Sequence, residues 1–177
     1  MPSAFGHALF GSALGASLRA RGAVIAAAAA CAVAPDLDVL AFRFGVPYEA
    51  ALGHRGFTHS LAFAAVLGVA AAGALCAALR RGRRPPFVRT AALLALATAS
   101  HGVFDALTDG GLGVAFFWPL DETRHFLPWR PIAVSPLGVG RFFSARGAEV
   151  LASEAIWVGL PGLALWLGRK LAMPRTR

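Results

Sequence analysis

The chain has 177 residues, of which 57% are hydrophobic and only 15% charged, and its mean hydropathy is +0.62. Soluble domains carry roughly 25% charged residues, so this composition excludes an ordinary soluble domain. The formal charge of +8 would suit nucleic-acid binding. However, eleven of the seventeen basic residues lie in three short stretches beside apolar runs, as in cytoplasmic loops of membrane proteins, which argues against a nucleic-acid partner and for membrane lipids. These residues are Arg19 and Arg21; Arg80, Arg81, Arg83, Arg84 and Arg89; Arg169, Lys170, Arg175 and Arg177.

The first two apolar runs are short. Ala4–Leu18 and Gly22–Ala34 are each about 20 Å long as helices, so they predict a helical hairpin whose turn is cytoplasmic. Whether this hairpin crosses fully or re-enters stays open. Pro35 is expected to end the second arm, because the residue before a proline avoids helical geometry. Asp36 and Asp38 then lie at the non-cytoplasmic end.

Three longer spans follow. Ser60–Leu79 is the clearest of them, and the arginine-rich loop after it is expected to be cytoplasmic. From Thr90 the chain returns outward, and Leu151–Leu167 forms the last span, with Pro161 and Gly162 expected to kink it. The basic tail then places the C-terminus in the cytoplasm.

About 40 residues between the last two spans, 107–148, lack helical periodicity and contain Trp118 and Trp129. Connections of this length are usually functional or disordered. Because aromatic rings favour the headgroup level, the tryptophans indicate an ordered interfacial cap. We therefore predict an all-α, multi-pass helical membrane bundle, a short N-terminal hairpin plus three longer spans, as one membrane-embedded domain over residues 1–177.

This topology sends every acidic residue and histidine to one face of the membrane. The nine acids and four of the five histidines lie on the non-cytoplasmic side, and the fifth, His7, joins them if the first arm starts there. Their placement was not used to derive the topology, so the segregation supports it independently. The thirteen are Asp36, Asp38, Glu49, His54, His59, His101, Asp105, Asp109, Asp121, Glu122, His125, Glu149 and Glu154.

Two motifs on this face offer metal ligands before the clearest span. Asp36-Leu-Asp38 sets two carboxylates close together, where a hard or borderline cation binds; the alternative is a solvated turn or a helix cap. In the string His54-Arg-Gly-Phe-Thr-His59, two imidazoles stand five residues apart. A lone histidine would be read as a hydrogen-bonded surface residue, but the pair favours a site.

A third motif lies at the end of the following span. His101 and Asp105 are four residues apart on a helix, so they share one face and can reach one ion. Ionisable groups near a spanning helix end are costly unless they are paired or functional. Asp109, one turn further, is predicted to orient a ligand or to act as the base that activates water. His7 is either a tolerated polar residue or part of the cluster, and the hairpin favours the cluster.

Mixed imidazole and carboxylate ligands suit Zn²⁺ or Mn²⁺, and seven candidates are enough for one or two ions. Such a site activates water and stabilises the attacking and leaving oxygens of a phosphoester. Arg55 and Arg130 are candidate substrate-binding residues that would hold an anionic group; the alternative for both is a lipid headgroup contact.

The motifs follow one another in a familiar order: an early histidine, Pro35-Asp-Leu-Asp38, His54-Arg-Gly-Phe-Thr-His-Ser60, His101-Gly-Val-Phe-Asp105 and Trp118-Pro119. This order resembles the YdjM-type family of inner-membrane-associated metal-dependent hydrolases, some of which are described as LexA-binding. The resemblance covers residues 3 to 135. It implies a bacterial inner-membrane location, a hydrolase, a LexA-type partner and metal-site roles for His7, Asp36, Asp38, His54, His59, His101 and Asp105.

Three functions compete at this stage. The first is a hydrolase at the non-cytoplasmic face that acts on a phosphoester or lipid-linked substrate; metal-activated water would attack, because the sequence has no nucleophilic Ser or Cys motif. The second is a metal or ion transporter, which needs polar groups through the membrane depth. The third is a non-enzymatic protein whose metal is structural, held in an all-protein shell.

Overall fold

The helices of the computed structural model agree with the predicted all-α class. The structure describes residues 1–136 and 142–171, and within them β structure is limited to two isolated bridges. Four helical segments are long and apolar enough to span a membrane: 22–44, 61–78, 87–106 and 145–171. The elements are α1 (Ala4–Ser17), α2 (Gly22–Val33), η1 (Ala34–Phe44), η2 (Phe57–His59), α3 (Leu61–Ala78), η3 (Arg81–Arg83), α4 (Phe87–Ala106), α6 (Ala145–Glu154), η4 (Ala155–Gly159) and α7 (Leu160–Leu171).

The second arm of the hairpin does not end at Pro35, which corrects the prediction. The α-helix ends at Val33, but the chain continues as the 3₁₀-helix η1, and Ala34 itself keeps right-handed helical angles. Proline is tolerated there because it occupies the first turn of the new helix, where its missing N–H is not needed. Asp36 and Asp38 consequently lie on a helix and not in a polar loop.

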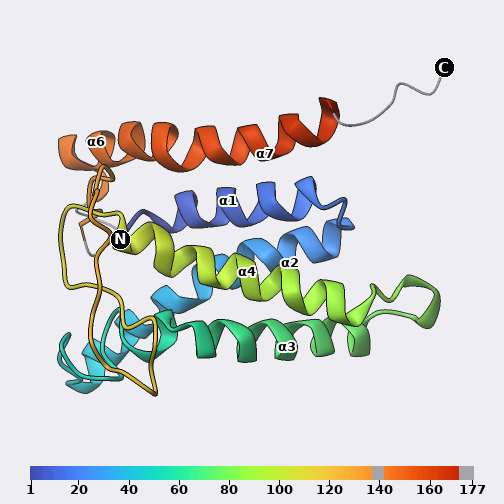
Figure 1. Cartoon of the computed structure of the whole chain (residues 1–177), viewed down its shortest axis with the longest axis horizontal. Coiled ribbons are helices and arrows are strands. Elements are labelled where there is room, and N and C mark those ends of the chain that lie inside the picture. The colour runs from blue at the N-terminus through green and yellow to red at the C-terminus, as the bar shows by residue number, and fades with distance from the viewer. Residues whose placement is uncertain (137–141, 172–177) are drawn as a thin grey trace.

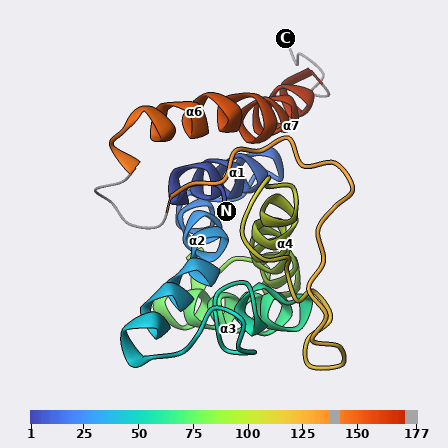
Figure 2. The ribbon, with the colours of Figure 1, turned by 90° about the vertical axis from the view of Figure 1, so that its left-hand side faces the viewer.

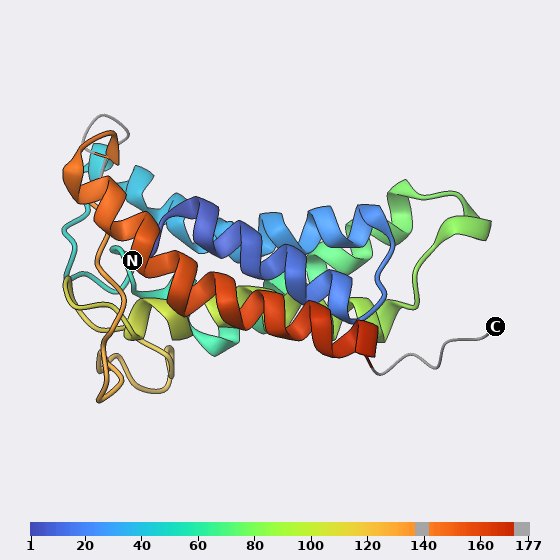
Figure 3. The same ribbon diagram turned by 90° about the horizontal axis from the view of Figure 1, so that it is seen from above.

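The helices lie in layers and share two distinct ends. The continuous α6–η4–α7 rod packs over α1, α1 packs on α2 and α4, and α3 lies on the far side against α4 (Figures 1 and 2). One end holds the start of α1, η1, the end of α4 and the irregular segment after it (Figure 3). The opposite end holds the α1–α2 turn, the α3–α4 loop and the end of α7. The described residues of the three arginine-rich stretches therefore share an end, as their pattern predicts.

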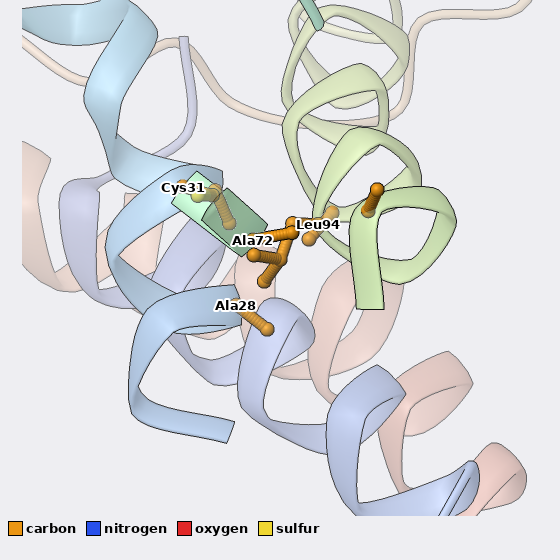
Figure 4. Packing of buried hydrophobic residues seen from close by; sticks show 7 residues of the cluster. Ala28, Cys31, Ala72 and Leu94 are labelled. Atoms are coloured by element: carbon orange, nitrogen blue, oxygen red, sulfur yellow. The ribbon is translucent and has the colours of Figure 1, made fainter. Parts of the chain in front are cut away.

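Small residues bring the central helices close together. Ala28 and Cys31 of α2 meet Ala72 of α3 and Leu94 of α4 in the core (Figure 4). Between α1 and α2, a Cβ atom at Gly11 would stand 2.7 Å from the Ala28 carbonyl oxygen, so only glycine fits there. Close backbone approach through small residues is how membrane helices gain packing contacts. This cluster carries no acidic, basic or histidine side chain.

The predicted cap and last span differ from the structure in their details. An irregular segment after α4 is held by bridges between Thr108 and Ile132 and between Val114 and His125. The last helix already begins at Ala145, so the irregular region ends before residue 148. The irregularity expected near Pro161 takes the form of a π-helical turn, η4, which directly precedes it.

Candidate metal centre

All seven residues predicted to hold metal converge at the cap end of the bundle. They come from five parts of the chain: α1, η1, the loop after it, η2 and the end of α4. Each is no more than 9% exposed. Buried carboxylates and imidazoles are costly unless they are paired or coordinate a metal. The residues are His7, Asp36, Asp38, His54, His59, His101 and Asp105.

Four of these side chains place one ligand atom each around a common point. Asp36, His59, His101 and Asp105 have ligand atoms that all lie within 4.8 Å of one another. The Nε2 atoms of His59 and His101 are 3.0 Å apart, and each stands 3.2 to 3.9 Å from carboxylate oxygens of Asp36 and Asp105. Two ligands about 2.1 Å from a tetrahedral ion lie about 3.4 Å apart. The four donors therefore have the spacing of one coordination shell.

The hydrogen bonds of the two histidines leave both Nε2 atoms free to bind a cation. His101 Nδ1 lies 2.7 Å from the Ala32 carbonyl oxygen, which can only accept, so Nδ1 carries the proton. Thr58 Oγ1 donates to Asp38 at 2.6 Å and so must accept from His59 Nδ1 at 3.0 Å. With both protons on Nδ1, two lone pairs face each other at 3.0 Å. That arrangement is stable only with a cation, either a proton or a metal ion, between them.

Asp38 acts differently from its neighbour Asp36. One oxygen of Asp38 lies 2.7 Å from His54 Nδ1, and the other accepts from Thr58 Oγ1 and from the Arg55 backbone N–H. Both oxygens of Asp38 are thus engaged by hydrogen bonds, so Asp38 orients His54 and His59 through their Nδ1 atoms. Asp38, His54 and His59 also form a second group with ligand spacing, but Asp38 is already engaged there by hydrogen bonds.

Several buried atoms of the first group have no hydrogen-bond partner among the described residues. Both carboxylate oxygens of Asp36 and of Asp105 are in this state, and so are both ring nitrogens of His7. His7 stacks on His101 with ring centroids 3.7 Å apart, and its Nε2 lies 3.5 Å from Asp105 Oδ1. Buried polar atoms without partners are rare in proteins. The donor set thus fits a divalent cation, which would satisfy the carboxylates.

The electrostatics of His59 agree with this arrangement. Burial alone would lower its pKa, but contacts with Asp105 and Asp38 outweigh burial and raise the pKa to about 9. Without a metal, both ring nitrogens of His59 therefore carry a proton at neutral pH, and the side chain is positively charged. A metal ion at Nε2 must displace the proton on that atom.

Arg55, predicted to bind substrate, lies instead inside the protein. It is 0% exposed, and its Nε forms an ion pair with Asp105 at 3.0 Å. Its other nitrogens donate to the carbonyls of Gly110 and Leu112 and to Thr108 Oγ1. With all these partners, the guanidinium group links the segment after α4 to Asp105 and is not available to bind a substrate. The left-handed backbone of Arg55, at φ 65°, marks local strain at the site.

The structure does not bring Asp109 and Arg130 to the cluster. The Asp109 carboxylate is 49% exposed; it accepts from the Val134 backbone N–H and lies 3.7 Å from Arg146. Arg130 is exposed and stands over the Phe126 ring. Their positions give the predicted catalytic and substrate-binding roles no support.

Sequence reasoning missed two residues that shape the site. Thr58 links Asp38 to His59. The neighbouring Ser60 caps α3, and its side chain accepts from the Phe63 N–H. Arg124 donates to the carbonyls of Tyr48, Ala50 and His54 and so fixes the loop that carries His54. Thr58 lies inside the histidine string, but nothing in the sequence marks Arg124.

The fold and site define a multi-pass helical membrane protein with a buried histidine–aspartate centre at one end. A family model described as "YdjM inner membrane protein" matches residues 1–175. The chain is also 43% identical over 135 residues to the inner membrane protein YbcI of Escherichia coli (strain K12), covering 76% of this chain and 75% of that protein. No solved structure matches the chain. The chain belongs to the YdjM inner membrane protein family, which confirms the resemblance and the inner-membrane location.

Proposed function

We propose that this protein is a metal-dependent hydrolase whose centre binds one divalent ion, Zn²⁺ or Mn²⁺, through Asp36, His59, His101 and Asp105. The observation that carries the proposal is the pair of Nε2 lone pairs facing each other at 3.0 Å beside carboxylate oxygens that accept no hydrogen bond among the described residues. Imidazole together with carboxylate is a donor set that both ions accept.

The arrangement of charges supports an orientation for the protein. Arginine-rich loops mark the cytoplasmic side of membrane proteins. We therefore assign the end with the α1–α2 turn and the α3–α4 loop to the cytoplasm, together with the C-terminus. The metal centre then faces the non-cytoplasmic side, where a phosphoester or lipid-linked substrate would reach it.

The residues of the centre divide the work of hydrolysis. A divalent ion supplies Lewis acidity and acidifies a water molecule for attack on the substrate. Asp38 and Thr58 hold the His59 ring so that Nε2 faces the ion. His7 has a free ring nitrogen beside Asp105, and it is the residue best placed to take a proton from the attacking water.

One observation favours a second function, a structural metal site. All four ligands are buried, His101 and Asp105 completely, and a shell closed by protein ligands is typical of structural zinc. A transporter is not favoured. The middle of the bundle is filled by residues such as Ala28, Ala72 and Leu94, which offer no ligands along the membrane depth.

The test uses the full chain purified in detergent. Elemental analysis should find about one divalent ion per chain, and Asp36→Asn should lose most of it. A panel of phosphodiester, phosphomonoester and carboxylic ester substrates should then reveal hydrolysis that a chelator abolishes. His7→Gln should keep the metal and lose activity, because His7 is assigned to proton transfer and not to the shell.

The outcomes separate the two functions. Metal present, no hydrolysis of any substrate, and unfolding on chelation would establish a structural site. Folded protein without metal after expression in metal-supplemented medium would overturn both readings.

A further inference from the structure

A cavity of about 640 Å³ opens at the arginine-rich end of the bundle, opposite the metal centre. Its walls are the α1–α2 turn with the first turn of α2 on one side, and the loop before α4 with the first turns of α4 on the other. This volume lies within the range of about 300 to 1,000 Å³ that is common for sites of small ligands.

The cavity is strongly positive. Arg19 and Arg21 line one wall, and Arg84 and Arg89 line the other. All four are exposed, and none forms an ion pair with a carboxylate among the described residues. The nine acidic side chains lie toward the opposite end, so none of them neutralises these arginines.

Two helix ends add to the same field. Arg21 and Pro86 are the N-caps of α2 and α4, and neither makes a side-chain capping bond. Both residues line the cavity. The free N–H groups of a helix N-terminus carry partial positive charge and attract anions. Four guanidinium groups and two helix ends therefore favour a bound anion.

Apart from Thr90, the other side chains of the lining are apolar. Val24 and Leu93 are buried at the base, whereas Leu18 and Leu96 are more than half exposed and extend the apolar lining toward the outer surface of the helices. A free inorganic anion would gain nothing from contact with this apolar lining. A ligand with a phosphate headgroup and a hydrocarbon chain would contact both the arginines and the apolar side chains.

We infer that this cavity binds an anionic phospholipid from the leaflet at the arginine-rich end. The arginines take the phosphate, and an acyl chain lies along Leu93 and Leu96. Basic pockets between membrane helices on the cytoplasmic side are known to bind acidic lipid headgroups. Such a lipid would tie the α1–α2 turn to the α3–α4 loop, which Arg21 already links through a hydrogen bond to the Arg83 carbonyl.

The test measures lipid binding by native mass spectrometry of the full chain in detergent. Phosphatidylglycerol should bind far more strongly than phosphatidylcholine. The variant Arg19→Gln/Arg89→Gln removes one arginine from each wall and should weaken phosphatidylglycerol binding about 30-fold, at about fivefold for each basic residue. Neither side chain makes a hydrogen bond or ion pair among the described contacts, so the fold should persist, which circular dichroism checks.

The matched control is Arg80→Gln/Arg81→Gln, which removes the same charge from the same end but outside the cavity. It should keep phosphatidylglycerol binding within a few fold. Equal losses in the two double variants would mean general attraction to the basic surface and would overturn the site. So would equal binding of the two lipids, or displacement of the lipid by millimolar inorganic phosphate, which would point to a free-anion site.

Discussion

The hydroxyl of Thr58 allows a sharp test of how the metal centre is held. Thr58 donates to Asp38 at 2.6 Å and accepts from His59 Nδ1 at 3.0 Å. Thr58→Val replaces this hydroxyl by a methyl group of similar size and leaves all four ligands in place. His59 then loses the acceptor that fixes its tautomer, and Asp38 loses a donor.

The expected effect is on metal affinity. Removing a group that orients a metal-ligating histidine typically weakens binding by about 10 to 100-fold, which corresponds to about 1.4 to 2.8 kcal/mol. Competition with a chromophoric chelator at fixed pH, on protein in detergent, measures this directly. Metal content at saturating ion should be unchanged, because the ligands remain.

The control is Thr98→Val in the middle of α4. Thr98 is also buried, and its hydroxyl donates to the Leu94 carbonyl of its own helix and to no metal-site residue among the described contacts. This variant should bind metal as tightly as the parent chain. If Thr58→Val also binds like the parent, Asp38 and Thr58 do not orient His59, and the division between Asp36 and Asp38 is wrong.

Three further outcomes follow from the contacts described. Asp109→Asn should leave metal content unchanged and lower the free energy of unfolding by at most about 1 kcal/mol, because only exposed contacts are lost. Loss of metal in this variant would support the predicted role of Asp109 in orienting a metal ligand. Arg55→Lys should destabilise the protein by about 3 kcal/mol or more, since lysine cannot replace the planar set of bonds around Asp105; a melting temperature like that of the parent would contradict this. As the pH rises from about 6.5 through about 9, the metal-free protein should lose stability, because the pKa of His59 is raised on folding. Metal binding near pH 7.5 should release about one proton, measurable by calorimetry in buffers of different ionisation heat.

The spans and the convergence of the site were predictable because both rest on patterns that repeat along the chain. The apolar run Ser60–Leu79 became α3 almost residue for residue. The arginine-rich connections assigned each helix end to one of two sides, and the acids and histidines then fell on the opposite side. Residues far apart in sequence, such as His7 and His101, are therefore predicted to lie at the same end of the bundle.

The sequence could not predict that Asp36 is placed to bind the metal whereas Asp38 holds the histidines, because this difference depends on the helix type of η1. With three residues per turn, Asp36 and Asp38 project about 120° apart and so face different partners. Arg55 was misjudged for a similar reason: its burial depends on a cap without periodicity, whose carbonyls come from residues more than fifty positions away.

The charge balance of the cluster explains why a divalent ion suits it better than a proton. Asp36, Asp38 and Asp105 bring three negative charges, Arg55 brings one positive charge, and neutral imidazoles bring none. The buried set is therefore short of two positive charges. A proton on His59 supplies one of them, whereas a divalent ion would supply both and also engage the oxygens of Asp36 and Asp105 that accept no hydrogen bond among the described residues. Because uncompensated charge is costly in a buried site, the proton acts as a weaker substitute that metal displaces. Asp36→Asn removes one negative charge, so the buried set is then short of only one positive charge. In that variant a proton on His59 should compete better with the metal ion, and the metal should be lost at a higher pH than from the parent chain.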